Sequence, residues 1–417
     1  MGFEGRLALR YLRSKRRYRF VSAVTLLAGA GVAVGVMALL VTLAVMDGFE
    51  QDLKRKLLGN MAPVTLTAKD LDQGDVEALK ERLADLPRVR GLTPYVRTQV
   101  LLAVSGRPFG ATLLGVDPDK VSLVNRLPDQ ILAGSLASLH RFPETGDDLA
   151  ECEGRPAILV GREMLHRLGA YLGDRIRLVS PVGIETPFGV VPVQNDYCIG
   201  GVFQTGLYEY DATFVYMSLE EAQRFLHLGS RVSGVEVGVH DPWRAREVAD
   251  RIRQRVDPAF RVEDWTQKNR RLLAAMRLEK VTAFGVLVLI VLVAVLSILS
   301  SLAMTVIEKR QEIAILKALG ATRRRILFLF VLQGLWIGVT GTLTGALAGI
   351  GICRLLKAYP VVTLPQDVFY QLTLPVELAT ADIFYVCLAT LALSLLAAFY
   401  PAWKAAQVPP AEGLRYG

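Results

Sequence analysis

The residues best suited to a function lie in Glu308–Arg325, a charged stretch that reads EKRQEIAILKALGATRRR. Ile313, Leu316 and Leu319 recur at helical spacing, and Gly320 is the residue type that commonly ends a helix. The predicted helix has about three turns, which is marginal for a helix alone in water, so it needs a surface to dock against. The segment is therefore either a simple turn between two longer helices or a coupling helix that binds a partner protein.

No sequence pattern of a self-contained enzyme is present. The chain has no G-x-x-x-x-G-K-[ST] loop for nucleotide phosphates, no H-E-x-x-H zinc motif, no G-x-S-x-G nucleophile and no paired C-x-x-C. His140, His166, His227 and His240 are scattered, and we interpret them as ordinary surface or partly buried side chains rather than metal ligands. We therefore expect no catalytic residue, no metal site and no cofactor in this chain.

The composition indicates a membrane protein. Of the 417 residues, 52% are hydrophobic and 21% are charged, and the mean hydropathy of +0.35 is too high for an ordinary soluble enzyme. Four uncharged stretches are long enough to cross a hydrocarbon core of roughly 30 Å. They are Phe20–Met46, Val281–Ile307, Ile326–Cys353 and Ile383–Trp403.

The length and residue types of these predicted spans restrict the possible functions. The first span follows a basic stretch, as a secretory signal would, but its apolar run is far longer than the roughly 7 to 15 residues of a signal, so we expect it to stay in the mature protein. No span interior carries Asp, Glu, Lys, Arg or His, whereas ion-coupled transporters usually need such groups at membrane depth. Energy for any transport must then come from a partner.

The net charge of +8 is distributed unevenly along the chain. Residues 1–19, 307–325 and 401–417 carry net charges of +6, +4 and +1, whereas residues 47–280 and 353–382 carry −2 and −1. Four spans place the three basic segments on one side, which the positive-inside rule assigns to the cytoplasm. We therefore expect both termini inside the cell and a large domain outside the inner membrane. Basic clusters beside spans are ordinary in membrane proteins, so no nucleic-acid partner is needed.

Residues 47–280 are predicted to form a folded α+β domain between the first and second spans. Pro63–Ala68 and Thr98–Val104 are β-prone runs, and Asp75–Leu86 has helical spacing between them. Residues from about 121 to 210 are richer in Gly, Pro and short strand-like runs, which predicts an inserted subdomain.

Two further features of this domain bear on its attachment and stability. Asp47–Leu58 and Thr266–Lys280 are charged yet compatible with helix, so each predicts a stalk that continues its span beyond the bilayer. Cys152 and Cys198 lie in the domain outside the membrane, where a disulfide is permitted, although the sequence does not fix their distance.

Several segments of the chain resemble those of a known family. Glu308–Arg325 resembles the permease signature of the MacB/FtsX class of ABC transporters, and Tyr400–Tyr416 resembles the closing motif of that class. The N-terminal stretch Leu7–Arg17, with Gly31–Val36 and Val45–Glu50, is similar to the lipoprotein-releasing permeases LolC and LolE. The fold class implied is a MacB-like membrane protein, in which four transmembrane α-helices carry a large α+β periplasmic domain between the first two.

The resemblance implies an ATP-driven complex of several subunits. This chain would be a permease that works with a LolD-like ATPase dimer, which binds ATP and Mg²⁺, and with a second permease that is LolE-like or a copy of itself. The complex would extract lipoproteins from the inner membrane and pass them to a LolA-like periplasmic carrier. The residues that match the ATPase coupling helix are Glu312, Ile313, Ile315, Leu316, Lys317, Leu319 and Gly320.

Two further sets of residues follow from the same resemblance. Pro181–Pro192 resembles the β-hairpin hook that recruits the carrier, with Pro181, Ile184, Pro187, Phe188, Gly189 and Val190 as its contact residues, although a plain solvent-exposed hairpin fits the same pattern. The residues that match the lipoprotein cavity are Val36, Leu40, Leu43 and Met46 of the first span and Phe284 and Leu287 of the second. Each of these six also fits ordinary packing between spans.

The expected layout contains eight segments in chain order. They are a cytoplasmic N-terminus with the first transmembrane helix (1–46), the periplasmic domain (47–280), the second helix (281–307), the coupling loop (308–325), the third helix (326–353), a short periplasmic loop (354–382), the fourth helix (383–403) and a cytoplasmic tail (404–417). A MacB-like efflux or mechanotransmission permease and an FtsX-like signalling protein that activates a cell-wall hydrolase remain alternatives.

Overall fold

The computed structural model of the chain describes residues 19–104, 107–140, 152, 154–186, 189–359 and 374–409. The chain divides into two compact units, and each is described by itself. Of the described residues, 19–51, 274–359 and 374–409 belong to the helical unit, and those between 52 and 273 belong to the sheet unit.

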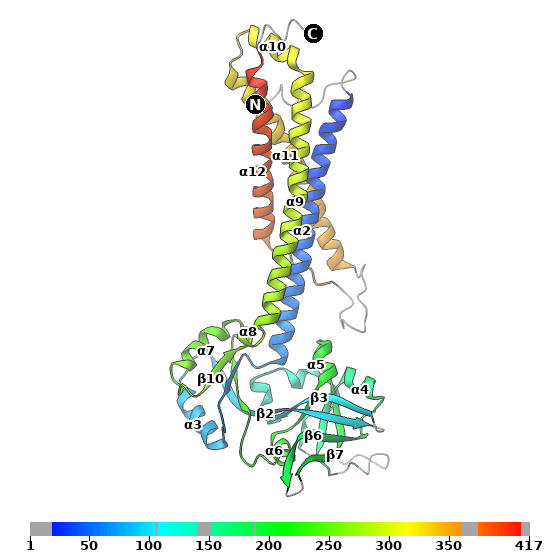
Figure 1. Cartoon of the computed structure of the whole chain (residues 1–417), viewed down its shortest axis with the longest axis vertical. Coiled ribbons are helices and arrows are strands. Elements are labelled where there is room, and N and C mark those ends of the chain that lie inside the picture. The colour runs from blue at the N-terminus through cyan, green and yellow to red at the C-terminus, as the bar shows by residue number, and fades with distance from the viewer. Residues whose placement is uncertain are drawn as a thin grey trace. The chain divides into compact units, whose positions relative to one another are not determined.

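Within the described residues, four helices are long and apolar enough to cross a membrane (Figure 1). They are α2 (Arg19–Asn60), α9 (Arg270–Glu308), α11 (Arg323–Ala358) and α12 (Thr380–Gln407). Each of the four uncharged stretches lies inside one of these helices. The predicted stalk after the first span is helical up to Asn60, as expected.

The predicted stalk before the second span begins later than expected. Thr266 belongs to a separate short helix, α8 (Trp265–Lys268), and α9 starts only at Arg270. The Asp264 carboxylate accepts hydrogen bonds from the backbone N–H groups of Thr266 at 2.7 Å and Gln267 at 3.2 Å, which caps α8 as an independent helix. Asn269 then leaves the helical conformation, so α8 and α9 do not form one continuous rod.

Small residues let the helices of the helical unit approach closely. Gly341 and Gly345 of α11 lie against the backbone of α2, so that a Cβ atom on Gly345 would meet the Ala33 carbonyl oxygen at 2.4 Å. Gly334 contacts Ala398 of α12 in the same way, with a separation of 2.3 Å from an added Cβ to the alanine Cβ. Small residues at four-residue spacing are the usual means by which transmembrane helices gain contact area, because lipid supplies no hydrophobic drive for their association.

We predict that Gly345→Ala lowers the free energy of unfolding by about 1–3 kcal/mol, because the added methyl group has to push two helix backbones apart. The measurement is thermal unfolding of the purified protein in detergent. Gly351→Ala on the same helix is the matched control, since nothing lies within 4 Å of a Cβ atom there. Equal melting temperatures for the two variants would contradict the close packing of α11 on α2.

The described part of the sheet unit contains one ten-stranded mixed sheet. Its strand order is β10-β1-β9-β2-β3-β8-β5-β7-β4, and β6 pairs with both β2 and β7. The β3–β8 and β5–β7 pairs are parallel. The strands are β1 (Val64–Thr67), β2 (Val89–Val104), β3 (Arg107–Val116), β4 (Ile131–Gly134), β5 (Ala157–Gly161), β6 (Arg175–Thr186), β7 (Gly189–Phe203), β8 (Phe214–Ser218), β9 (Gly234–Val239) and β10 (Arg261–Asp264).

Helices between the strands cover the apolar core of this sheet. They are α3 (Gln73–Leu83), α4 (Arg162–Leu168), α5 (Tyr208–Thr213), α6 (Leu219–Phe225) and α7 (Ala245–Arg253). The helix expected at Asp75–Leu86 is α3, and it begins two residues earlier because Asp72 and Asp75 form a reciprocal capping box. Leu79, Phe225 and Ile252 bring one buried side chain each from α3, α6 and α7 into a single apolar cluster.

The region expected as an inserted subdomain contributes strands to the main sheet. Residues 121–210 supply β4 to β7, and β5 pairs with β8 on one side and β7 on the other. A disulfide joins Cys152 to Cys198 across this region, with 5.9 Å between their Cα atoms. Since the two cysteines are 46 positions apart in sequence, the bond closes a long loop and restricts the unfolded chain.

Candidate functional site

The coupling segment forms a short helix that packs on the ends of three long ones. In α10 (Arg310–Ala318), Ile313 and Ala314 are fully buried. Ile313 belongs to a cluster with side chains from the adjoining ends of α9, α11 and α12, which are Val306, Ile326, Leu329, Phe330, Ala402, Ala405 and Ala406. The Glu308–Arg325 segment and the start of the closing motif at Tyr400, which are distant in sequence, therefore pack on one another. Figure 1 shows α10 at this end of the bundle.

A lysine fastens α10 to the last turn of α12. The Lys317 ammonium donates hydrogen bonds to the backbone carbonyl oxygens of Ala406 at 2.6 Å and Val408 at 2.7 Å. Carbonyl groups at a helix C-terminus lack helical partners and carry partial negative charge, so a cation is favoured there. Burial and the nearby Arg323 guanidinium lower the pKa of Lys317.

The end of α10 is shaped by Gly320, as the sequence predicts. Gly320 has a φ of +98°, a left-handed conformation that glycine adopts without steric cost. The N–H of Gly320 bonds to the Lys317 carbonyl and that of Ala321 to the Leu316 carbonyl, which is the Schellman arrangement. The chain then turns at once into α11, so α10 is held at both ends.

The seven predicted coupling residues divide into inward and outward groups. Ile313 and Lys317 face the bundle, Leu316 is half-buried against it, and Glu312 pairs with Lys309. Ile315 and Leu319, one helical turn apart, are exposed by 43% and 80%. The exposed arginines Arg323, Arg324 and Arg325 follow directly in sequence. The result is a rigidly seated helix that presents an apolar pair beside positive charge.

A groove opens between α2, α9 and α12 within the helical unit. Its volume is about 620 Å³, and its lining is almost entirely apolar. Leu43 and Phe284, two of the predicted cavity residues, line it. Val36, Leu40 and Leu287 do not; they are buried in the core of the bundle, and Met46 is half-buried outside the lining.

The lining that the sequence analysis missed comes mainly from α12. Tyr385, Ala389 and Leu393 recur there every four residues, a helical period that can be seen in the sequence. The sequence does not show which helix packs beside α2 and α9. Two charged residues, Lys280 and Asp382, also line the groove.

The segment predicted as the hook lies in a long β-hairpin. Strands β6 and β7 pair antiparallel from Arg175 opposite Cys198 to Thr186 opposite Gly189. The register shifts between Ser180 and Ile184, and Pro181 and Pro192 lie at that irregularity, where a missing N–H is tolerated. Pro187 and Phe188 lie outside the described residues. Ile184, Gly189 and Val190 lie in the paired strands of the hairpin.

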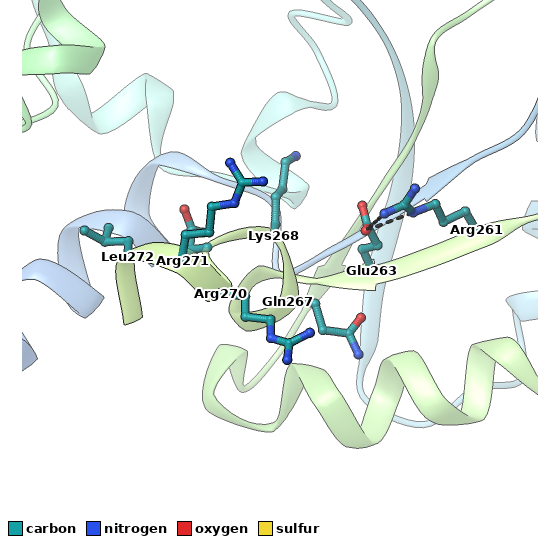
Figure 2. Close-up of a pocket in the computed structure, with 8 residues that line it drawn as sticks. Arg261, Glu263, Gln267, Lys268, Arg270, Arg271 and Leu272 are labelled. Carbon is teal, nitrogen blue, oxygen red and sulfur yellow. Dashed lines mark hydrogen bonds and ion pairs between the residues drawn. The ribbon is translucent and has the colours of Figure 1, made fainter. Parts of the chain in front are cut away.

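A second cavity, of about 720 Å³, lies in the sheet unit around the start of α9 (Figure 2). Arg261 and Glu263 form an ion pair on one wall. In Figure 2 the side chains of Lys268 and Arg271 point to one side, whereas Arg270 points to the other. The cations therefore do not converge on one anion. Burial lowers the pKa of Lys268, and burial also raises that of Glu236, with which Lys268 interacts.

Similarity to known proteins agrees with this architecture. Residues 25–255 match the MacB-like periplasmic core domain and residues 284–410 match the FtsX-like permease C-terminal region. The chain is 33% identical over 419 residues to a lipoprotein-releasing system transmembrane protein LolC of Xylella fastidiosa, covering 98% of each. It belongs to the LolC/LolE family. A LolE of Haemophilus influenzae is 27% identical over 98% of each chain.

The family models also indicate the general architecture of the chain. A solved structure of the periplasmic region of MacB from Actinobacillus actinomycetemcomitans matches with 14% identity and a TM-score of 0.31, covering 51% of this chain and 94% of that one. The family models and the four apolar helices make this chain a multi-pass membrane protein with a periplasmic domain. The predicted resemblance to the MacB/FtsX class and to LolC and LolE is confirmed.

We predict that Lys317→Met lowers the free energy of unfolding by about 1–3 kcal/mol, because two hydrogen bonds from a charged donor are lost at the end of α12. Thermal unfolding of the purified protein measures the change. Lys357→Met, at an exposed position near the end of α11, serves as the control. A melting temperature unchanged by Lys317→Met would show that α10 stays seated without this contact.

Proposed function

We propose that this chain is a permease subunit of an ATP-driven complex that releases lipoproteins from the bacterial inner membrane. The observation that supports this most directly is its similarity, over nearly the whole length, to lipoprotein-releasing system transmembrane proteins. The identity is higher to LolC than to LolE, which favours a LolC-type role. The second permease would be a LolE-like chain or a copy of this one.

In this proposal, α10 is the helix that a LolD-like ATPase binds. Ile315 and Leu319 form a small exposed apolar face, and an apolar anchor surrounded by polar residues is typical of the centre of a protein interface. ATP and Mg²⁺ would be bound by that partner and not by this chain. Because Ile313 and Lys317 fix α10 to α9, α11 and α12, a displacement of α10 would be passed directly to the membrane helices.

The groove and the hairpin supply the remaining parts of the proposed path. Burial of an acyl chain contributes roughly 0.8 kcal/mol per CH₂, so an apolar cavity open to the bilayer suits a lipid anchor. The groove of one chain has room for about one acyl chain, so the three chains of a lipoprotein anchor would need the second permease as well. The β6–β7 hairpin would recruit the LolA-like carrier.

Charging the exposed face of α10 tests the ATPase contact. The double variant Ile315→Asp, Leu319→Asp should abolish co-purification with the ATPase, because two carboxylates would replace the apolar anchor. The permease itself should remain folded, since both side chains are exposed. Gln311→Asp, an exposed change on the same helix, should retain the ATPase. Full ATPase retention by the double variant would refute the assignment.

Removing the hairpin tip tests the carrier contact and separates the alternatives. With residues 184–191 replaced by a two-residue turn, reconstituted vesicles should hydrolyse ATP at the normal rate but should no longer release lipoprotein to soluble carrier. A MacB-like efflux permease would keep its transport activity after this deletion. An FtsX-like signalling protein would release no lipoprotein even with the hairpin intact, which would overturn the proposed function.

A further inference from the structure

The last turn of α2 is held in the sheet unit through Asn60, which is only 6% exposed. The Gln130 side-chain amide donates a hydrogen bond to Asn60 Oδ1 at 2.6 Å, and Asn60 Nδ2 donates to the Thr205 carbonyl oxygen at 3.4 Å. The Arg126 N–H donates to the Gly59 carbonyl oxygen at 3.0 Å. Carbonyl groups in the last turn of a helix have no partner within the helix, so this bond satisfies one of them. We call these five residues the α2 joint.

The α2 joint lies at the base of the β6–β7 hairpin. Thr205 lies two positions after the end of β7, and Gln130 lies directly before β4. The Gln204 N–H donates to the Gln130 carbonyl oxygen at 2.9 Å, which connects the two partners of Asn60 to one another. From this point β7 extends back to Gly189, paired first with β4 and β5 and then with β6. A continuous hydrogen-bonded ladder therefore links the joint to the hairpin proposed to bind the carrier.

The turn that receives Asn60 is itself firmly held. The Asp211 carboxylate is fully buried and accepts hydrogen bonds from the Thr205 N–H and the Thr205 hydroxyl group, both at 2.8 Å. Gly206 has a φ of +79°, and a Cβ atom there would lie 3.5 Å from Lys56 Cε of α2. Buried and hydrogen-bonded segments open only at a high free-energy cost, so a displacement of α2 has to move the base of β7 with it.

The start of α9 is attached differently from the end of α2. Arg270, Arg271 and Leu272, the first residues of α9, are all exposed. On α2, by contrast, Leu57 in the last turn is only 5% exposed, and Ala62 just beyond the helix only 3%. Because buried contacts resist displacement more than exposed ones, α2 rather than α9 sets the position of β7.

We propose that the α2 joint couples the nucleotide state of the complex to the affinity of the β6–β7 hairpin for its carrier. A movement of α2 that accompanies ATP binding is passed through Asn60 and Gln130 to the base of β7. Both residues act through β7, so they are positioning residues rather than carrier contacts. The inference rests on the proposed roles of the ATPase and the hairpin, and it adds the path between them. By linkage, the carrier changes the affinity of the complex for ATP by the same factor.

The test compares carrier affinity in two nucleotide states of the complete complex. The permease pair with its ATPase is reconstituted in nanodiscs, and the dissociation constant of a fluorescent carrier is measured without nucleotide and with a non-hydrolysable ATP analogue. In wild type the two constants should differ about fivefold or more, which is the lower end of typical allosteric coupling. Asn60→Ala should reduce this difference to less than about twofold and leave the constant without nucleotide within about twofold of wild type.

Two further variants keep the test decisive. Gln130→Ala removes the other side chain of the joint without changing α2, so it tests the coupling even if Asn60→Ala does not fold. It should remove the difference as Asn60→Ala does, and the double variant should show no further loss, because both changes break one shared hydrogen bond. Arg271→Ala, at the exposed start of α9, is the matched control and should keep the wild-type difference.

Several results would overturn the proposal. One is a wild-type complex that binds carrier equally in both nucleotide states. Another is a difference of wild-type size in Asn60→Ala and Gln130→Ala, including the case in which both states bind carrier more weakly by the same factor, since that is a structural defect alone. Loss of the difference in Arg271→Ala would assign the coupling to α9 instead. A wild-type complex that binds no carrier in either state would refute the carrier role of the hairpin itself, which separates failure of the proposed function from failure of the joint.

Discussion

The attachment of α10 to the ends of the long helices is the contact on which the functional interpretation rests. An isolated helix of nine residues has too few hydrogen bonds to offset the entropy of forming it, so its structure depends on the surface beneath it. That surface is made by small side chains of α12, including Ala402, Ala405 and Ala406, which leave room for Ile313. Lys317 adds a polar contact that sets the position of the helix along α12.

The close approach of the long helices follows from the same choice of small residues. The glycines of α11 bring its backbone against both α2 and α12, and this arrangement leaves α9 to pack on α2 through Gly31 and Gly35. Hydrocarbon does not drive apolar helices together, so contact area and van der Waals packing have to do so. The groove exists because the larger side chains of α2, α9 and α12 do not fill the space at one side of this contact.

Much of this architecture was predictable because it follows from local pattern. Four uncharged runs, a short amphipathic helix ending at Gly320, and the α3 capping residues are all encoded within a few positions of the chain. Pairings between distant segments were not predictable. Membership of β4 to β7 in the main sheet, the contribution of α12 to the groove and the burial of Val36 and Leu40 all depend on which elements pack together.

Three charged residues at or near the groove show the same limit. Asp47, Lys280 and Asp382 each lie one residue outside an uncharged run, so along the sequence each looks like an ordinary flanking charge. Only the fold brings Asp47 to Lys280 and places Lys280 and Asp382 at the same groove.

The groove opens through its exposed apolar side chains, so a lipid-anchored molecule would enter it by lateral diffusion within its own leaflet. Its occupancy would then follow the surface density of that molecule in the bilayer rather than any concentration in the surrounding water.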